Sequence, residues 1–248
     1  MRFDVITLFP ELFEPFLKVG ITRRAFESGL VDVHFSNPRD FALGNYRRVD
    51  DRPFGGGPGM VMLAEPLALA VQSIKAQRND GAPVVLFSPI GKTLNHSAVQ
   101  HWSDSVGAIL ICGRYEGLDQ RFIDHYVDQQ ISLGDFVLSG GEVAAMALLD
   151  AVARLQPGVL SDEDSHHQDS FNPALDGLLD CPHYTRPESW AGHDVPSVLL
   201  SGNHAHIETW RRQQRLLNTA KYRPDVLATV REAGHLSLAD ERLLAGRS

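Results

Sequence analysis

The sequence predicts an α/β fold, with a parallel sheet in the N-terminal part and helices in the C-terminal part. Short apolar runs of the kind found in buried parallel strands occur at Pro83–Phe87 and Ala108–Cys112. Helical patterns lie between and after them, and this alternation favours a parallel sheet. Residues 155–182 differ, because they are acidic, contain Pro, Gly, Ser and paired His, and show little periodicity. The alternation is therefore expected to end near residue 155.

The elements are expected in a simple order along the chain. The predicted strands are Arg2–Leu8, Val31–Phe35, Pro83–Phe87 and Ala108–Cys112. Helices are predicted over 10–28, 63–76 and 143–155, and the C-terminal remainder is expected to be helical, with 205–222 its clearest segment. Residues 41–62 contain RRVDDRPFGGGPGM, whose glycines and prolines are typical of a loop. We interpret residues 161–176 as a mobile linker.

Composition limits the class of protein. The chain has 248 residues, 43% hydrophobic and 22% charged, which is typical of a globular protein with a sizeable core. The only two cysteines, Cys112 and Cys181, suit a reducing compartment and form no metal motif. The first residues do not resemble a signal peptide, and no apolar run approaches the roughly 20 residues that span a bilayer. We therefore expect a cytoplasmic protein with no membrane association.

The charge is unevenly distributed. The net charge of −8 comes from 23 basic and 31 acidic residues. Six acidic residues and no Lys or Arg lie in 160–180, whereas 201–223 has five basic residues against one acidic residue. Arg47, Arg48 and Arg52 form a smaller basic cluster. Basic stretches of this kind are compatible with contacts to nucleic-acid phosphates, despite the acidic total.

Three glycine-bearing loops follow apolar strands: 88–91 (SPIG), 113–117 (GRYEG) and 131–142 (ISLGDFVLSGGE). In the last loop, taken alone, a plain turn between strand and helix explains the glycines equally well. Loops at the carboxyl ends of parallel strands converge, however, and ligands collect there. Glycine also lets a backbone bend sharply or approach a ligand closely. Three such loops together favour a small-molecule site.

Several common sites lack support in the sequence. Gly91-Lys92-Thr93 resembles the end of a phosphate-binding loop, but Leu86 stands where that motif requires glycine. The run 55–59 (GGGPG) has Met60 where a dinucleotide motif needs its last glycine. The paired histidines lack zinc-like spacing, and no GxSxG is present. Nucleotide hydrolysis, zinc binding and acyl transfer are therefore disfavoured.

Segments that run nearly end to end resemble the bacterial tRNA (guanine-N1)-methyltransferases, which are knotted methyltransferases of the SPOUT class. The matching segments are ITLFPELF, DDRPFGGGPGMVM, SPIGKTL, CGRYEGLDQR, ISLGDFVLSGGE, ARLQPGVL, DSF, LLDCPHYTRPE and VPSVLLSGNHAHIETWR. The combination of the glycine loops with GGGPGMVM is specific. Composition and periodicity alone do not predict a knot, because knots are essentially absent from ordinary folds.

The resemblance implies three parts and an activity. Residues 1–160 would form an S-adenosylmethionine-binding domain with a deep trefoil knot, 161–176 a flexible linker, and 177–248 a small helical tRNA-binding domain. The enzyme would be a homodimer with its active site at the subunit interface. It would transfer a methyl group from S-adenosylmethionine to N1 of the guanine immediately 3′ of the anticodon in tRNA.

The resemblance also implies roles for individual residues. Asp169, contributed by the partner chain, would be the general base, and Arg154 would stabilise guanine O6. Magnesium is implicated in similar enzymes, with Glu116 and Asp169 as possible contacts, although no metal-ligand motif is present. Without the resemblance, Asp169 is explained as a solvated loop carboxylate and Arg154 as a salt-bridge residue. The implied S-adenosylmethionine-binding residues are Leu86, Ser88, Pro89, Gly91, Gly113, Tyr115, Glu116, Gly117, Ile131, Ser132, Leu133, Gly134, Asp135, Phe136, Val137, Leu138, Gly140 and Gly141.

The chain departs from the family pattern at three positions. Gln168 stands where many relatives carry Glu, Leu86 where Tyr is frequent, and Ile90 where Gln is frequent. The first departure changes the surroundings of Asp169, and the other two affect the expected adenine pocket. Two alternatives stay open from the sequence. One is a knotted RNA-binding protein without catalysis, and the other is a kinase that binds ATP through residues 91–93.

Overall fold

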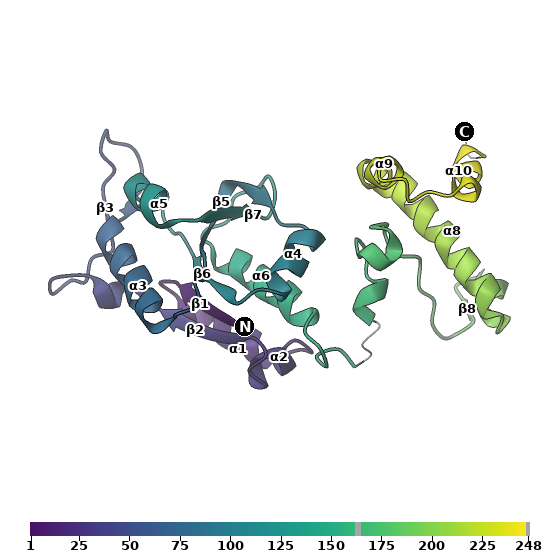
Figure 1. The fold of residues 1–248 in the computed structure, drawn as a ribbon, viewed down its shortest axis with the longest axis horizontal. Coiled ribbons are helices and arrows are strands. Elements are labelled where there is room, and N and C mark those ends of the chain that lie inside the picture. Colours follow the sequence, from purple (N-terminus) through teal and green to yellow (C-terminus); the bar gives the residue numbers. More distant parts are fainter. Residues whose placement is uncertain (162–164, 247–248) are drawn as a thin grey trace. The chain divides into compact units, whose positions relative to one another are not determined.

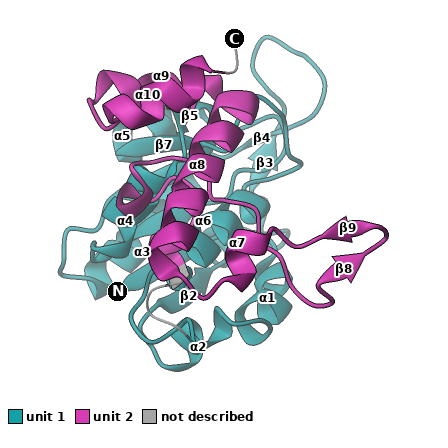
Figure 2. Cartoon of the chain, turned by 90° about the vertical axis from the view of Figure 1, so that its right-hand side faces the viewer, with its two compact units in different colours: residues 1–163 teal, residues 164–248 magenta. Residues whose placement is uncertain are grey.

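The computed structural model describes residues 1–161 and 165–246. The chain divides into two compact units, Met1–Glu163 and Asp164–Ser248, which are distinguished by colour in Figure 2. Residues 162–164 of the expected linker lie outside the described residues, and the division into three domains stays a prediction.

Unit 1 is built on a five-stranded sheet in the order β2-β1-β6-β5-β7 (Figure 1). The strands are β1 Arg2–Ile6, β2 Asp32–Ser36, β5 Val84–Thr93, β6 Gly107–Ile111 and β7 Gln129–Ser132. All four strand pairs are parallel. The predicted α/β fold with a parallel sheet is confirmed. A separate two-stranded ladder, β3 Asp50–Asp51 with β4 Val61–Met62, lies inside the segment expected to be a loop.

The core of unit 1 has two layers, one on each face of the sheet. Along β6, which is entirely buried, Ala108 and Leu110 belong to one apolar cluster, and Ile109 and Ile111 belong to the other. Side chains of a strand alternate between its faces, so a strand buried on both sides reads as a continuous apolar run. This is the physical reason why AILI signals a central parallel strand.

The helices of unit 1 cover these two faces. Helix α6 contributes to the first cluster and α3 to the second, and the two helices lie on opposite sides of the sheet in Figure 1. The helical segments are η1 Pro10–Phe13, α1 Glu14–Lys18, α2 Arg23–Glu27, η2 Pro38–Phe41, α3 Ala64–Gln77, α4 His96–Ser103, α5 Gln120–Tyr126 and α6 Glu142–Arg154.

The single helix expected over residues 10–28 is wrong. The segment forms η1, α1 and α2, with an interruption at Val19 and Gly20. Val19 is extended (φ −122°, ψ 151°) and Gly20 has φ +82°. A glycine reaches this left-handed conformation without the steric cost that a Cβ atom brings. The apolar spacing continues across the break, which is why the pattern alone predicts one helix.

Unit 2 is mostly helical in its described residues. Its elements are η3 Ser165–Gln168, η4 Pro173–Leu175, β8 Ser189–Trp190, β9 His193–Asp194, α7 Ser197–Leu200, α8 His204–Tyr222, α9 Pro224–Glu232 and α10 Leu238–Ala245. Its small core centres on Leu178, Leu216, Leu227 and Val230. The helix predicted over 205–222 is found as α8, whose N-terminus is capped by the side chain of Asn203.

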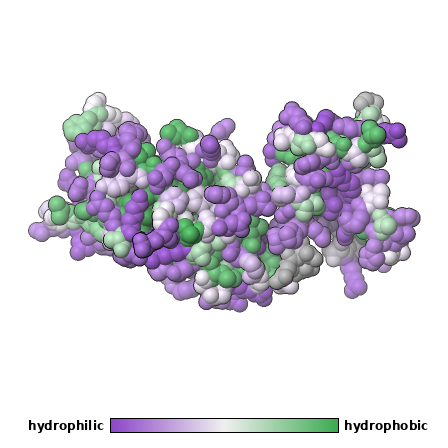
Figure 3. Space-filling view, viewed as in Figure 1, coloured by the Kyte–Doolittle hydropathy of each residue, from purple (hydrophilic) through white to green (hydrophobic). Residues whose placement is uncertain are grey.

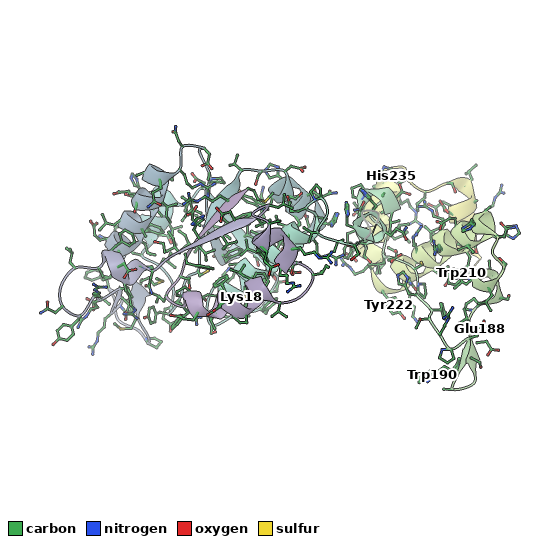
Figure 4. The ribbon with its side chains drawn as sticks, turned by 90° about the horizontal axis from the view of Figure 1, so that it is seen from below. Lys18, Glu188, Trp190, Trp210, Tyr222 and His235 are labelled. Carbon is green, nitrogen blue, oxygen red and sulfur yellow. The ribbon has the colours of Figure 1, made fainter. Side chains whose placement is uncertain are left out.

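Figure 4 labels two tryptophans of unit 2. Trp190 is exposed on the β8–β9 hairpin, and Trp210 lies on α8. The Trp210 ring is 6.2 Å from the ring of Tyr184, centroid to centroid. This contact packs the segment before the hairpin against α8.

Candidate cofactor-binding cleft

The three glycine loops enclose one cleft in unit 1, with a volume of about 290 Å³. This size lies at the lower end of the range of small-molecule pockets. The cleft is formed at the ends of β6 and β7 and at a bulge within β5. The carboxyl ends of parallel strands are the edge at which such sheets collect ligands. The residues that line it are Leu86, Phe87, Ser88, Pro89, Gly113, Arg114, Tyr115, Glu116, Gly117, Leu118, Ile123, Ile131, Ser132, Leu133, Gly134, Phe136, Val137, Leu138, Ser139, Gly140, Gly141 and Ala144.

The first loop leaves the sheet as a bulge within β5. Phe87 pairs with Ile131 of β7, and Lys92 pairs with the same residue, so residues 88–91 are extruded between them. Gly91 closes this bulge. A Cβ atom on Gly91 would lie 2.5 Å from the backbone carbon of Gln130 and from the backbone nitrogen of Ile131. Glycine is therefore required here by the close passage of two backbones.

The third loop crosses the second at equally close range. The Gly141 amide donates to the Gly113 carbonyl at 3.0 Å. A Cβ atom on Gly141 would lie 2.7 Å from Cα of Cys112. The neighbouring atoms are backbone and have no side-chain freedom with which to move away. Gly141 is thus the residue that lets α6 begin directly beside the end of β6.

Replacing Gly141 with alanine is expected to lower the stability of unit 1 by about 1–3 kcal/mol, the usual cost of overpacking, and to weaken the binding of S-adenosylmethionine that the resemblance implies for this cleft. The reason is that the 113–117 and 131–142 loops must separate to make room for the alanine side chain at position 141. Urea unfolding and calorimetric titration with S-adenosylmethionine would measure the two effects. Gly246→Ala is the control, because a Cβ atom there would lie 3.6 Å from its nearest neighbour, an ordinary van der Waals distance. Equal behaviour of the two variants would contradict this account of Gly141.

The wall of the cleft is apolar and partly exposed. Phe136, Val137 and Leu138 all remain exposed at its rim. Ser132, which is buried, accepts from the Gly134 amide at 3.1 Å and so shapes the turn that precedes them. A concave apolar surface with a few fixed polar groups is the usual form of a cofactor site.

A buried ion pair between Arg114 and Glu142 stabilises the loops that form the cleft. The Glu142 side chain, at the start of α6, is only 1% exposed. Its Oε1 accepts from Thr7 Oγ1 at 2.8 Å and from Arg114 Nε at 3.1 Å. Arg114 Nη2 forms an ion pair with Glu142 Oε2 at 2.9 Å, but the geometry of this contact is not that of a hydrogen bond. Arg114 also donates to the Ser139 carbonyl at 3.2 Å and lies over the Phe9 ring.

This arrangement ties together the end of β1, the 113–117 loop and the start of α6. The same two charged side chains also affect the pKa of the neighbouring Cys112 thiol. Burial, and next the charge of Glu142, raise the pKa of Cys112 well above its usual value, and Arg114 lowers it by less. Cys112 therefore stays protonated at neutral pH and is a packing residue, since the thiolate is the reactive form.

The GGGPGMVM segment is attached to the second loop by its backbone. The Glu116 amide donates to the Met60 carbonyl at 3.0 Å, and the Met62 amide donates to the Gly117 carbonyl at 2.8 Å. A Cβ atom on Gly59 would meet the Glu116 side chain at 2.4 Å. The β3–β4 ladder is thus joined to the 113–117 loop, whose Glu116 lines the cleft.

Tyr115 connects the cleft to β3. Its φ of +61° places it in the left-handed region. Burial, followed by the carboxylate of Asp50, raises its pKa, and Arg39 lowers it. The Tyr115 hydroxyl is therefore neutral at neutral pH. It extends from the 113–117 loop toward Asp50, the first residue of the β3–β4 ladder.

The structure brings most of the residues expected to bind S-adenosylmethionine to this single cleft. Two of them, Gly91 and Asp135, are not among its lining residues. Their expected role and that of the other residues remain predictions. Six lining residues were not expected: Phe87, Arg114, Leu118, Ile123, Ser139 and Ala144. Arg114, Leu118 and Ser139 lie within or beside the glycine loops, whereas Ile123 and Ala144 come from helices α5 and α6, which carry no loop signal.

The two residues expected to be catalytic lie in different units. Arg154 ends α6 in unit 1 and does not line the cleft. Asp169 belongs to unit 2, where the buried Asn172 forms hydrogen bonds with the backbone around it. The Asn172 amide donates to the Asp169 carbonyl at 3.2 Å, and its side chain donates to the His166 carbonyl at 2.9 Å and accepts from Ala174. These bonds give the backbone around Asp169 a defined conformation within its unit.

The described residues contain neither a candidate metal centre nor a membrane-spanning helix. In 1–161 and 165–246, no three His, Cys, Asp or Glu side chains are grouped so as to hold a metal ion. No helix in the same ranges has the length and hydrophobicity needed to cross a bilayer.

A parallel α/β sheet with three glycine loops around one cleft defines a small-molecule-binding protein of the cofactor-dependent class. A sequence model of the family described as tRNA (Guanine-1)-methyltransferase TrmD matches residues 1–229. The chain therefore belongs to this family of methyltransferases, which in general use S-adenosylmethionine, and the predicted resemblance is confirmed.

Relatives from three bacteria carry the name tRNA (guanine-N(1)-)-methyltransferase. The protein of Albidiferax ferrireducens is 74% identical, and the match covers 100% of both chains. Those of Polaromonas sp. (strain JS666) and Paracidovorax citrulli are 70% and 68% identical, with 99% of this chain and 96% and 98% of their own covered. The similarity therefore includes both units.

Proposed function

We propose that this protein transfers a methyl group from S-adenosylmethionine to N1 of the guanine immediately 3′ of the anticodon in tRNA. The observation that carries the proposal is the cleft. The three loops whose sequences match the family come from distant parts of the chain, and together they line one small-molecule pocket. A tRNA substrate makes the cytoplasm the expected location.

The residues of the cleft fit S-adenosylmethionine in chemical character. Its apolar side chains, among them Leu86, Ile131 and Leu138, offer a surface for a planar base. The glycines let the ligand approach the loop backbones, and Glu116 supplies a negative charge suited to a cationic sulfonium. When bound, the cofactor supplies an electrophilic methyl group.

Two close backbone crossings support the proposed trefoil knot. The segment before α6 passes the end of β6 at Gly141, and β5 passes β7 at Gly91. In both places a Cβ atom would contact backbone. Glycine permits backbones to approach this closely, and a knot, in which one segment is threaded past another, would need such close approaches.

The reaction needs a base because guanine N1 carries a proton. Asp169 would take this proton, a contribution of about 10²–10⁴ in rate. Negative charge then gathers on O6, where the guanidinium of Arg154 would stabilise it. In the proposed homodimer, Asp169 of one subunit completes the cleft of the other. Glu116 and Asp169 are the proposed contacts for Mg²⁺, whose preferred ligands are oxygens.

Unit 2 is the proposed tRNA-binding part, and its internal contacts narrow the candidate bases. Arg212 pairs with Asp176 and Asp240, and Arg215 lies 3.6 Å from Asp180. These two arginines hold α8 against the rest of the unit. On the same helix, Arg211 is more exposed and pairs with Glu208, and Lys221 lies over the Tyr222 ring. The phosphate contacts of α8 would therefore fall to Arg211 and Lys221.

Transfer of a labelled methyl group to tRNA transcripts tests the proposal. A transcript with guanine 3′ of the anticodon is expected to be labelled, and one with adenine at that position is not, because adenine N1 carries no proton to remove and its neighbouring substituent is not O6. A kinase would instead bind ATP and show no affinity for S-adenosylmethionine. A knotted protein without catalysis would bind S-adenosylmethionine and label neither transcript.

A further inference from the structure

The loop between β3 and β4, residues 52–60, presents an aromatic ring to solvent. Phe54 is 100% exposed, although phenylalanine is among the residues most often buried. Gly55, Gly56 and Gly57 follow it, each with a positive φ. Figure 1 shows this loop projecting beside β3, and Figure 3 shows hydrophobic surface at its tip.

The base of this loop contacts a residue that lines the cleft. Gly59 lies against the Glu116 side chain, and Met60 accepts a hydrogen bond from the Glu116 amide. Five residues of chain span at most roughly 18 Å, so Phe54 is tethered within that distance of Gly59. The ring is therefore tethered to a segment that contacts Glu116, a residue of the cleft.

The arginines beside this loop are available to an anionic partner. Among the described residues, no carboxylate lies within ion-pair distance of Arg48 or Arg52, and both are exposed. Arg47 has a partner, Asp40, at 3.3 Å, and both of these side chains are mostly exposed. An exposed aromatic ring on the same loop as the exposed Arg52, with Arg48 just before β3, matches single-stranded RNA, whose bases stack on aromatic side chains while its phosphates attract arginine.

We propose that Phe54 stacks on a tRNA base next to the methylated guanine, and that Arg48 and Arg52 contact the adjoining phosphates. The inference rests on the proposed function, because tRNA is the occupant. N1 lies on the pairing edge of guanine, so the base must leave its stack to be methylated. A neighbouring base then loses a stacking partner, and Phe54 replaces it. Stacking is tolerant of sequence because every base has a π face.

Steady-state methyl transfer with substitutions at Phe54 tests this role. Phe54→Ala is expected to raise the KM for the guanine transcript by about 5- to 100-fold, the usual effect of removing one stacking ring. The dissociation constant for S-adenosylmethionine should stay unchanged. Phe54→Trp should retain a low KM, and Phe54→Leu should behave as Phe54→Ala, since leucine is apolar but has no ring.

Leu43→Ala is the matched control, because Leu43 is also apolar and highly exposed (86%) but lies in the other loop beside β3. It should leave the KM unchanged. Arg52→Ala should reduce the slope of log affinity against log salt by about 0.7, the value for one phosphate contact to a single strand. Thermal unfolding should be the same for all variants, since none of these side chains is buried.

Three results would overturn the inference. They are an unchanged KM in Phe54→Ala, wild-type behaviour of Phe54→Leu, and a change of oligomeric state in Phe54→Ala, which would make the loop a subunit contact. Failure of the proposed function is distinguishable from all three, because the unsubstituted protein would then not methylate the guanine transcript at all.

Discussion

Substitution of Asp169 by alanine is expected to lower the rate of methyl transfer by about 10²–10⁴-fold and to leave the affinity for S-adenosylmethionine unchanged. The rate effect is that of losing a general base. Guanine N1 is a poor nucleophile until its proton leaves, and alanine cannot accept that proton. The cofactor affinity is spared because the loops that line the cleft belong to unit 1, whereas Asp169 belongs to unit 2.

Single-turnover methyl transfer and calorimetric titration with the cofactor would separate the two quantities. Asp169→Asn is the informative companion, because it keeps the shape of the side chain but is not a base. It should be as slow as Asp169→Ala. Glu232→Ala, which removes an exposed carboxylate at the end of α9 in the same unit, is the control and should retain full activity. Equal losses of cofactor binding and transfer would remove Asp169 from the role of base.

Replacing Arg114 with alanine is expected to lower the free energy of unfolding of unit 1 by about 3–5 kcal/mol. The reason is that Glu142 would remain buried without its cationic partner, and removing one member of a buried pair costs about this much. The change corresponds to a fall in melting temperature of roughly 6–20 °C for a unit of this size. Denaturant and thermal unfolding would measure both quantities.

The control for Arg114 is Arg121→Ala. Arg121 pairs with Asp119 at 2.6 Å, but its side chain is 80% exposed. An exposed pair contributes about 0–1 kcal/mol, so this variant should unfold almost as the wild type does. The double variant Arg114→Ala/Glu142→Gln should recover part of the lost stability, because the unpaired charge is then absent. Additive losses in the double variant would show that the pair is not coupled.

The sheet is the part of the fold that local sequence patterns predict best. The runs at β5 and β6 are short, apolar and rich in β-branched residues. A strand that is buried on both faces carries apolar side chains at successive positions, so such a run indicates a strand of this kind. The break near Val19 was not predictable in the same way. Apolar spacing continues through it, and only the backbone conformation of Val19 and Gly20 divides the segment into separate helices.

For the glycine loops of the cleft, too, the sequence predicted one feature and not another. Their convergence was predictable, because carboxyl ends of parallel strands share one edge. The particular task of each glycine was not. Gly113 lines the cleft, whereas Gly91 accommodates the backbone of β7. A missing side chain serves a ligand or a neighbouring strand equally well, so the residue type cannot tell the two apart.

The sequence by itself determined the family, the parallel sheet and the three loops that would surround a ligand. Each of these features depends on residues that are contiguous in the sequence, where apolar periodicity and specific motifs can be recognised. Only the tertiary structure determined that Arg114 and Thr7 meet at Glu142, that Ile123 and Ala144 join the cleft, and that Phe54 is exposed on the loop between β3 and β4. Such contacts join residues that are far apart along the chain, and their formation depends on how the helices pack on the sheet. No local pattern in the sequence specifies that packing.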